Sequence, residues 1–199
     1  MTYFDRQNAT SYVDVSVEPG IEVNKFLLAT EEVVGIFRLL NATAFAPVIS
    51  DMNGNIKKIR DKYNENPSAT PTLQSIIQDE RAKGQDTATV GMQWLFRGLC
   101  FTSDALRDSL SNPSHELAES FTKSYEGTLK PYHGFLVKGI FTVAMKACPY
   151  RKDFFLKLGP DVSVVEHKME IWLQGLEKIN GIMCGVYKVS SYRGPGDYP

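Results

Sequence analysis

Hydrophobic residues recur at helical spacing along most of the chain. Five of them between residues 43 and 60 follow one another at intervals of three or four, which places them along one stripe of a helix. They are Phe45, Val48, Met52, Ile56 and Ile59. Proline, glycine and capping residues separate this segment from others like it. Helices are predicted to begin near Glu22, between Thr43 and Pro47, after Thr72, at Thr87, near Glu116, after Pro131 and near Val165.

These segments predict an all-α domain. The segment from Thr87 to Leu110 is apolar on almost all sides, so its helix should run through the middle of the fold. The helix from Val165 carries an apolar seam that packs on neighbouring helices. Residues 1–20 lack a regular pattern and are predicted to be an extended lead-in, with residues 190–199 as a tail. The chain, residues 1–199, is expected to be one domain, a two-layer helical sandwich of about eight helices.

The composition excludes several classes of partner. The chain has 199 residues, of which 43% are hydrophobic, enough for one sizeable core. Its net charge is -1 and its lysines and arginines are scattered, which argues against nucleic acid as a partner. It shows no signal peptide and no run of 18 apolar residues, so a cytoplasmic protein is expected. The three cysteines lie in apolar surroundings and are expected to be reduced.

Three polar residues share one face of the second predicted helix. Asp51, Asn55 and Lys58 stand at positions i, i+4 and i+7, so an acid, an amide and an amine project over two turns. Taken alone, such a face is usually solvated. The chain shows no zinc-ligand spacing, phosphate loop or nucleophile motif. We therefore expect no metal, cofactor or catalytic site, although His133 and Asp51 have the chemistry of an acid–base pair.

Several motifs, in the right chain order, resemble the glycolipid transfer protein family. They are the trio Asp51, Asn55 and Lys58, Trp94 in Trp-Leu-Phe-Arg-Gly-Leu, His133 in Pro-Tyr-His-Gly-Phe, and the flanking segments Phe-Ala-Pro-Val-Ile-Ser-Asp and Ala-Cys-Pro-Tyr-Arg-Lys-Asp-Phe. The resemblance runs from about residue 23 to 188 and is closest to the fungal heterokaryon-incompatibility (HET-C-like) branch. It implies a lipid carrier rather than an enzyme, which binds a glycosphingolipid and moves it between membranes.

The resemblance also implies a head-group site of five residues. An ionised Asp51 would accept hydrogen bonds from the lipid amide N–H and a sugar hydroxyl, and His133 would donate to the amide carbonyl. Asn55 and Lys58 would bind sugar hydroxyls, and the Trp94 ring would stack on the sugar. Without the resemblance, Trp94 would be interpreted as a core residue and His133 as a hydrogen-bonded core or helix-start residue.

Two further sets of residues follow from the resemblance. The lipid chains would lie in an apolar sleeve lined by Phe37, Phe45, Val48, Phe101, Phe141, Met145, Phe154 and Trp172. Any helical core contains such residues, so composition does not separate a filled core from a collapsible pocket. The membrane would be contacted by Phe135, Tyr125, Tyr150 and Lys138. Arg97, close to Trp94, is expected to be structural and to need a carboxylate or carbonyl partner.

Two positions bear on the choice of head group. Family members that bind ceramide 1-phosphate-type lipids carry arginines where this chain has Val90 and Trp94, so the resemblance implies a neutral lipid such as glucosyl- or galactosylceramide. A phosphosphingolipid carrier is the alternative, and so is a glycolipid sensor or adaptor with the same pocket. The protein is expected to be a monomer that is associated peripherally and transiently with the membrane.

Overall fold

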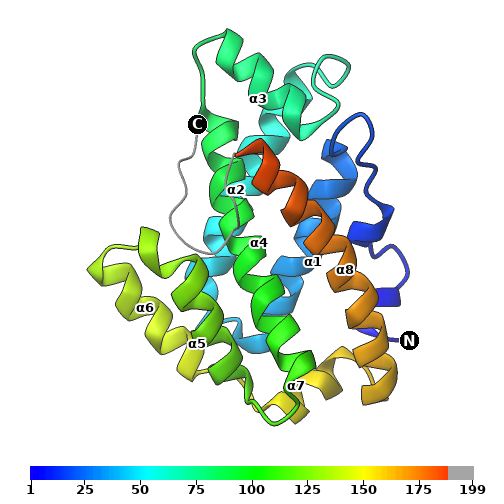
Figure 1. Ribbon diagram of the computed structural model, residues 1–199, viewed down its shortest axis with the longest axis vertical. Coiled ribbons are helices and arrows are strands. Elements are labelled where there is room, and N and C mark those ends of the chain that lie inside the picture. The colour runs from blue at the N-terminus through cyan, green and yellow to red at the C-terminus, as the bar shows by residue number, and fades with distance from the viewer. Residues whose placement is uncertain (188–199) are drawn as a thin grey trace.

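Eight α-helices build the part of the chain that the structure, a computed structural model, describes, residues 1–187 (Figure 1). The 3-10 turns are η1 (Tyr3–Asp5), η2 (Tyr12–Asp14) and η3 (Lys130–Tyr132). The helices are α1 (Val23–Asn41), α2 (Ala46–Glu65), α3 (Leu73–Ala82), α4 (Thr87–Ser111), α5 (Leu117–Thr128), α6 (Phe135–Lys146), α7 (Arg151–Leu158) and α8 (Val162–Val186). The predicted all-α fold is confirmed, and the predicted tail from residue 190 lies outside the described residues.

Helix α4 is the centre of the arrangement. It packs against α2, α5 and α8, and Figure 1 shows α4 and α8 with α1 and α2 behind them. Its side chains are buried in several directions, as Phe96, Leu99 and Phe101 illustrate. This agrees with the segment's apolar character on almost all sides. Among the helices of residues 1–187, none is both long and apolar enough to cross a membrane.

Local capping signals place helix ends where the sequence predicts them. The Thr72 hydroxyl accepts a hydrogen bond from the backbone N–H of Ser75 at 3.1 Å, and α3 begins at the next residue. The Glu22 carboxylate accepts from the N–H of Lys25 at the start of α1. Helix α7 was not predicted as a separate element, because eight residues are too few to show a helical stripe.

The start of α4 depends on a contact that no local pattern shows. The buried carboxylate of Glu80, on α3, accepts hydrogen bonds from the backbone N–H groups of Ala88 and Thr89 at 2.8 and 2.7 Å. It also accepts from the Thr89 hydroxyl at 2.7 Å. A carboxylate at a helix N-terminus satisfies otherwise unpaired donors and is favoured by the helix dipole. Helix α3 therefore anchors the end of the helix that carries Trp94.

The N-terminal segment is not the extended lead-in that the sequence predicts. Its two 3-10 turns pack on α1 and α8 through buried tyrosines. The Tyr3 hydroxyl donates to the carbonyl of Glu32 at 2.7 Å, and the Tyr12 hydroxyl pairs with that of Thr30 at 2.9 Å. This part of the prediction was wrong because single anchoring side chains leave no periodic pattern in the sequence.

Candidate functional site

Three of the five residues predicted to bind the head group line one cavity. Asp51 on α2, Trp94 on α4 and His133, between η3 and α6, border a space of about 330 Å³. The same cavity has apolar walls from Val48, Met52, Leu129, Val137, Ile140 and Phe141. A few convergent polar groups in an apolar cavity are typical of a small-molecule site. The arrangement suits a ligand with a polar head and an apolar body.

Asp51, Asn55 and Lys58 form a hydrogen-bonded series along α2. The amide nitrogen of Asn55 donates to Asp51 Oδ2 at 3.1 Å, and Lys58 Nζ donates to Asn55 Oδ1 at 3.1 Å. Burial raises the pKa of the Asp51 carboxyl, while the Lys58 charge and the Asn55 amide act in the opposite direction. Asn55 is thus held in one orientation, with its nitrogen toward Asp51 and its oxygen toward Lys58.

The two remaining members of the predicted site lie beside the cavity rather than in its wall. The Asn55 side chain is buried, with only 2% of the residue exposed, and supports Asp51 from behind. Lys58 is exposed, and its stem passes over α4 at Gly91, where a Cβ would lie 3.2 Å from Lys58 Cδ. Glycine therefore leaves the space that the lysine stem uses. Direct contact of Asn55 and Lys58 with a sugar stays a prediction.

Arg97 is held between two aromatic rings next to the cavity. Its guanidinium carbon lies 4.5 Å from the centroid of the Trp94 ring and 3.7 Å from that of Tyr132. Such cation–π contacts are worth more for a buried cation than for an exposed one. The sequence predicts that Arg97 needs a carboxylate or carbonyl partner, and residue spacing alone does not predict its contacts with these two ring faces. Arg97 thereby stabilises the orientation of Trp94.

His133 faces Trp94 and is anchored from below by Tyr125. The Trp94 and His133 rings are nearly parallel, with 6.1 Å between centroids and 19° between planes. Nδ1 of His133 lies 3.1 Å from the Tyr125 hydroxyl. Burial, followed by the charges of Lys138 and Arg97, lowers the pKa of the His133 imidazole below its ordinary value. The ring is therefore neutral at pH 7.

Tyr125 was predicted to contact the membrane, and this was wrong. Only 3% of the residue is exposed, and its ring stacks on Phe141 of α6, with 4.8 Å between centroids. The tyrosine lies on the face of α5 that packs against α6. A tyrosine suits a membrane surface and a buried hydrogen bond equally well, so residue type alone did not decide between them.

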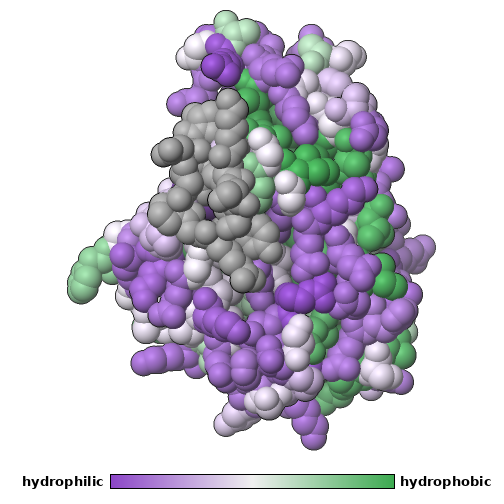
Figure 2. Space-filling model, in the orientation of Figure 1, coloured by the Kyte–Doolittle hydropathy of each residue, from purple (hydrophilic) through white to green (hydrophobic). Residues whose placement is uncertain are grey.

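The other predicted membrane residues are accessible to different degrees. Phe135 is 95% exposed and Tyr150 is 72% exposed, whereas Lys138 is half-buried. Helix α6 also exposes Leu136, Ile140 and Val143, which the prediction missed. Their spacing of four and three was visible in the sequence as a second apolar stripe on a helix that is apolar nearly all round. In Figure 2, hydrophobic surface protrudes beside α6 at the left edge of the molecule.

Most residues of the predicted apolar sleeve are buried and meet near the cavity. One aromatic cluster contains Phe37, Phe45, Phe101 and Phe141. The prediction missed a fifth member, Phe121. The ring centroid of Phe101 lies 5.4 Å from that of Phe121 and 6.1 Å from that of Phe141. Val48 and Phe141 also line the cavity, so the cluster continues from it. Met145 and Phe154 are buried as well.

Trp172 is the exception in this set. Its ring packs against Phe4 and Tyr12 of the N-terminal segment, with centroid distances of 5.5 and 5.7 Å. The structure thus places Trp172 beside the N-terminal turns, and the assignment to the sleeve is corrected. The sequence could not show this, because the N-terminal segment has no helical pattern that predicts its contact with α8.

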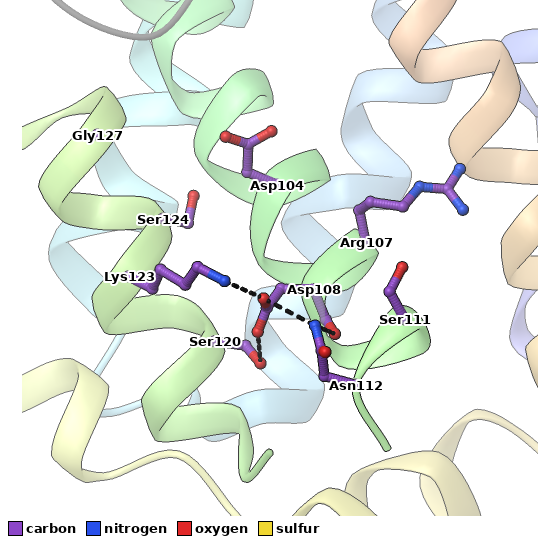
Figure 3. A pocket seen from close by; sticks show the side chains of 9 residues that line it. All are labelled: Asp104, Arg107, Asp108, Ser111, Asn112, Ser120, Lys123, Ser124 and Gly127. Atoms are coloured by element: carbon purple, nitrogen blue, oxygen red, sulfur yellow. Dashed lines mark hydrogen bonds and ion pairs between the residues drawn. The ribbon is translucent and has the colours of Figure 1, made fainter. Parts of the chain in front are cut away.

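A second hollow, between α4 and α5, is polar (Figure 3). The Asp108 carboxylate lies at its centre and accepts hydrogen bonds from Ser120 at 2.8 Å and Lys123 at 2.6 Å. The same carboxylate contacts Asn112 Nδ2 at 3.2 Å and His115 Nδ1 at 2.9 Å. These side chains satisfy one another's hydrogen bonds, and the bonds to Asp108 connect α4 with α5. Across residues 1–187, no group of three His, Cys, Asp or Glu side chains is arranged to hold a metal ion.

Asp108→Ala is expected to lower the free energy of unfolding by about 2 kcal/mol at pH 7, because charged hydrogen bonds between α4 and α5 are lost. Burial raises the pKa of Asp108, but hydrogen bonds from His115, Lys123 and Ser120 outweigh burial and lower it to about 2. A depressed carboxyl pKa contributes stability that is present above its ordinary value and lost as pH falls. Urea unfolding should show the difference from wild type in full above about pH 4 and shrinking toward pH 2. A difference that is constant with pH would contradict this role.

The sequence and fold are similar to those of known lipid-binding proteins. The family described as Glycolipid transfer protein (GLTP) matches residues 21–160. A glycolipid transfer protein of Aureobasidium melanogenum is 46% identical over 183 residues, 92% of this chain and 90% of the relative. The crystal structure of HET-C2, a fungal glycolipid transfer protein, matches with a TM-score of 0.86 and 43% identity, over 91% of this chain and 94% of that chain. A structure of FAPP2, described as selecting simple glycosphingolipids with the GLTP fold, matches with a TM-score of 0.87 and 30% identity, over 94% and 95%.

Proposed function

We infer that this chain, which belongs to the glycolipid transfer protein family, binds a glycosphingolipid and transfers it between membranes. The observation that carries this inference is the shared cavity of Asp51, Trp94 and His133. These residues come from three separate parts of the chain, and they meet above apolar walls. The family is one of transfer proteins, and we propose that the protein catalyses no reaction.

The two ionisable residues of the cavity match the amide linkage of a ceramide. The Asp51 carboxylate has only acceptors, so it suits the amide N–H and a neighbouring hydroxyl. The neutral His133 ring offers a donor to the amide carbonyl. One acceptor and one donor on either side of the linkage select an N-acyl lipid over a diacylglycerol lipid, which has no amide N–H. Neither residue needs to transfer a proton.

The sugar would occupy the outer part of the cavity. The Trp94 ring presents a flat apolar surface, and its partly exposed position leaves it accessible. Lys58 is exposed beside Asp51, where its ammonium can donate to hydroxyls. We propose that Asn55 acts in two ways, by fixing Asp51 and by offering its second amide hydrogen to a sugar hydroxyl. Within residues 1–187, the hydrogen bonds of the Asn55 side chain use one of its two amide hydrogens and leave the second for a ligand.

The lipid chains require more space than the cavity now has. A volume of about 330 Å³ is at the lower end of drug-sized sites, and a two-chain lipid is larger. The walls lead from Val48 and Phe141 into the cluster of Phe37, Phe45 and Phe101. Helix α6 packs mainly on α5 and exposes its opposite side, so it is the wall that can move. We propose that the chains enter between α6 and α2 and separate the packed phenylalanines.

The energetics favour a carrier that needs no energy source. Transfer of about thirty methylenes from a bilayer into water is unfavourable by roughly 24 kcal/mol, at about 0.8 kcal/mol for each methylene. Spontaneous escape of such a lipid is therefore slow. An apolar sleeve replaces one apolar environment with another, so loading and unloading have a small net free energy. Selectivity then rests with the polar residues at the mouth.

We propose that α6 is the membrane-docking element. Phe135 and Leu136 project from its first turn, and Ile140 and Val143 continue the exposed apolar stripe. The cavity that holds His133 opens next to this helix, so docking would bring the lipid entrance to the bilayer. Such an association is peripheral, since the exposed residues reach only the interface. We propose that the protein docks in this way as a monomer, from the cytoplasmic side of the membrane.

The head group that we propose is a simple neutral sugar. A phosphate needs fixed cations, and the two positions where arginines would serve it hold Val90 and Trp94. We expect the protein, incubated with a total lipid extract and re-isolated, to carry hexosylceramides when its lipids are identified by mass spectrometry. Enrichment of ceramide 1-phosphate instead would overturn the head-group assignment.

A glycolipid sensor is the alternative that the same cavity allows. A sensor would retain its lipid, whereas a carrier exchanges it with acceptor vesicles. Preloaded protein mixed with lipid-free acceptor vesicles separates the two. We expect release within minutes of membrane contact, and retention over hours would favour the sensor.

A further inference from the structure

Three rings form a compact group at one wall of the head-group cavity, where His133 and Phe141 line the cavity and Tyr125 lies behind them. Tyr125 stacks on Phe141 with 11° between the ring planes, and His133 lies 4.7 Å from Phe141 between centroids. The Tyr125 hydroxyl lies 3.1 Å from His133 Nδ1. These residues come from α5, α6 and the connection between them, so the α5–α6 hairpin fixes all three. The orientation of His133 is thereby set from the interior.

The direction of this hydrogen bond follows from the partners on each side. A neutral imidazole has one donor nitrogen and one acceptor nitrogen, and the bond made by one decides the role of the other. Within residues 1–187, the buried Tyr125 hydroxyl has His133 Nδ1 as its hydrogen-bond partner and no second acceptor. A buried hydroxyl that did not donate would leave its hydrogen unsatisfied. The phenol therefore donates to Nδ1, and the ring proton resides on Nε2.

Burial supports this assignment on both sides of the bond. It raises the pKa of the Tyr125 phenol, so the hydroxyl keeps its proton. It also lowers the pKa of His133, so Nδ1 keeps its lone pair. The nitrogen that remains for a ligand in the cavity is Nε2, and it is a donor.

We propose that Tyr125 is a positioning residue for lipid binding, which holds His133 as the Nε2–H tautomer so that the ring presents a donor to the carbonyl of an N-acyl lipid. The proposal rests on the proposed function and adds a residue that itself does not contact the ligand. It also explains why a tyrosine is buried at this position, where phenylalanine would fill the same space beside Phe141.

A double-mutant cycle with His133 tests the proposal. Tyr125→Phe keeps the ring and removes the hydroxyl, and we expect vesicle-to-vesicle transfer of galactosylceramide to fall about fivefold, the size of one neutral hydrogen bond. In a His133→Ala background the same change should have no further effect, because Tyr125 acts through His133. Tyr12→Phe is the matched control: it removes the hydroxyl of another buried tyrosine, which is bonded to Thr30 and does not line the cavity. Transfer by this control should equal that of wild type.

A spectroscopic measurement on the ligand-free protein gives an independent result. With ring-15N-labelled histidine at pH 7.5, the signals that disappear in His133→Ala belong to His133. We expect a protonated Nε2 and an unprotonated Nδ1 in wild type, and averaged tautomers in Tyr125→Phe. A proton on Nδ1 in wild type, unchanged transfer by Tyr125→Phe, or an equal loss with and without His133 would overturn the proposal. If wild type transfers no glycolipid, the proposed function fails, while the nitrogen signals still decide whether Tyr125 sets the tautomer.

Discussion

Asp51→Asn is expected to lower glycolipid transfer about 10- to 100-fold. The change replaces one carboxylate oxygen with an amide nitrogen, which presents a donor where the lipid amide or a sugar hydroxyl also presents a donor. Hydrogen bonds to a charged group contribute about 1.5 to 3 kcal/mol, which corresponds to this range. The asparagine retains one oxygen to accept from the buried Asn55, so the fold should keep its support. Initial rates of galactosylceramide transfer between vesicles measure the effect.

Two further variants show whether the loss belongs to the site. Asp61→Asn makes the same change on the same helix, where Asp61 pairs with exposed Lys57, and it should transfer like wild type. Asp51→Val removes both oxygens and should transfer still less, with a free energy of unfolding lower by about 1 to 3 kcal/mol because the Asn55 amide loses its acceptor. Equal transfer by Asp51→Asn and wild type would contradict the role of this carboxylate.

The double change Phe135→Asp and Leu136→Asp is expected to weaken vesicle binding at least 100-fold. Each apolar side chain gains about 1.5 to 3 kcal/mol when it leaves water, and both are almost fully available to a bilayer. The fold should tolerate the change, since acidic residues in the first turn of a helix are favoured by its dipole. Sedimentation with vesicles measures the binding, and transfer should fall in parallel.

The matched control for docking is Ile171→Asp. Ile171 is an exposed apolar residue on α8, a helix that lies apart from α6 in Figure 1, so its replacement should leave vesicle binding unchanged. Binding of a short-chain, water-soluble galactosylceramide should remain intact in the α6 double variant, because Asp51 and Trp94 are unaltered. Undiminished vesicle binding by the double variant would show that another surface docks.

Most of the helices and the direction of Asp51 were predictable because local rules determine them. Thr72 caps α3 through its own hydroxyl, and the apolar stripe that includes Met52 fixes the inward face of α2. The direction of the Asp51 side chain follows from the same stripe, because the position of a residue on a helix fixes its direction relative to the apolar residues. Motif order then connected Trp94 and His133 to Asp51, although periodicity alone would have left both in the core.

What the sequence did not reveal depends on contacts between distant segments. Tyr125 was predicted to contact the membrane, but the packing of α6 on α5 places its hydroxyl within hydrogen-bond distance of His133. Trp172 looked like a sleeve residue, but Tyr12, in an unpatterned segment, packs against it. Asn55 lies beside the cavity, hydrogen-bonded to Asp51, and its direct contact with a sugar stays a prediction. For Tyr125 and Trp172 the residue type was assigned to a plausible environment, and only tertiary packing selected the actual one.

The central claim, that this cavity carries a glycolipid between membranes, is tested most directly by transfer of fluorescent galactosylceramide from donor to acceptor vesicles by the wild-type protein. We predict transfer that rises with protein concentration, recovery of the intact lipid, and at least tenfold slower transfer of ceramide 1-phosphate, about the discrimination of one well-placed charged contact. Absence of transfer, or appearance of free galactose and ceramide, would contradict the account.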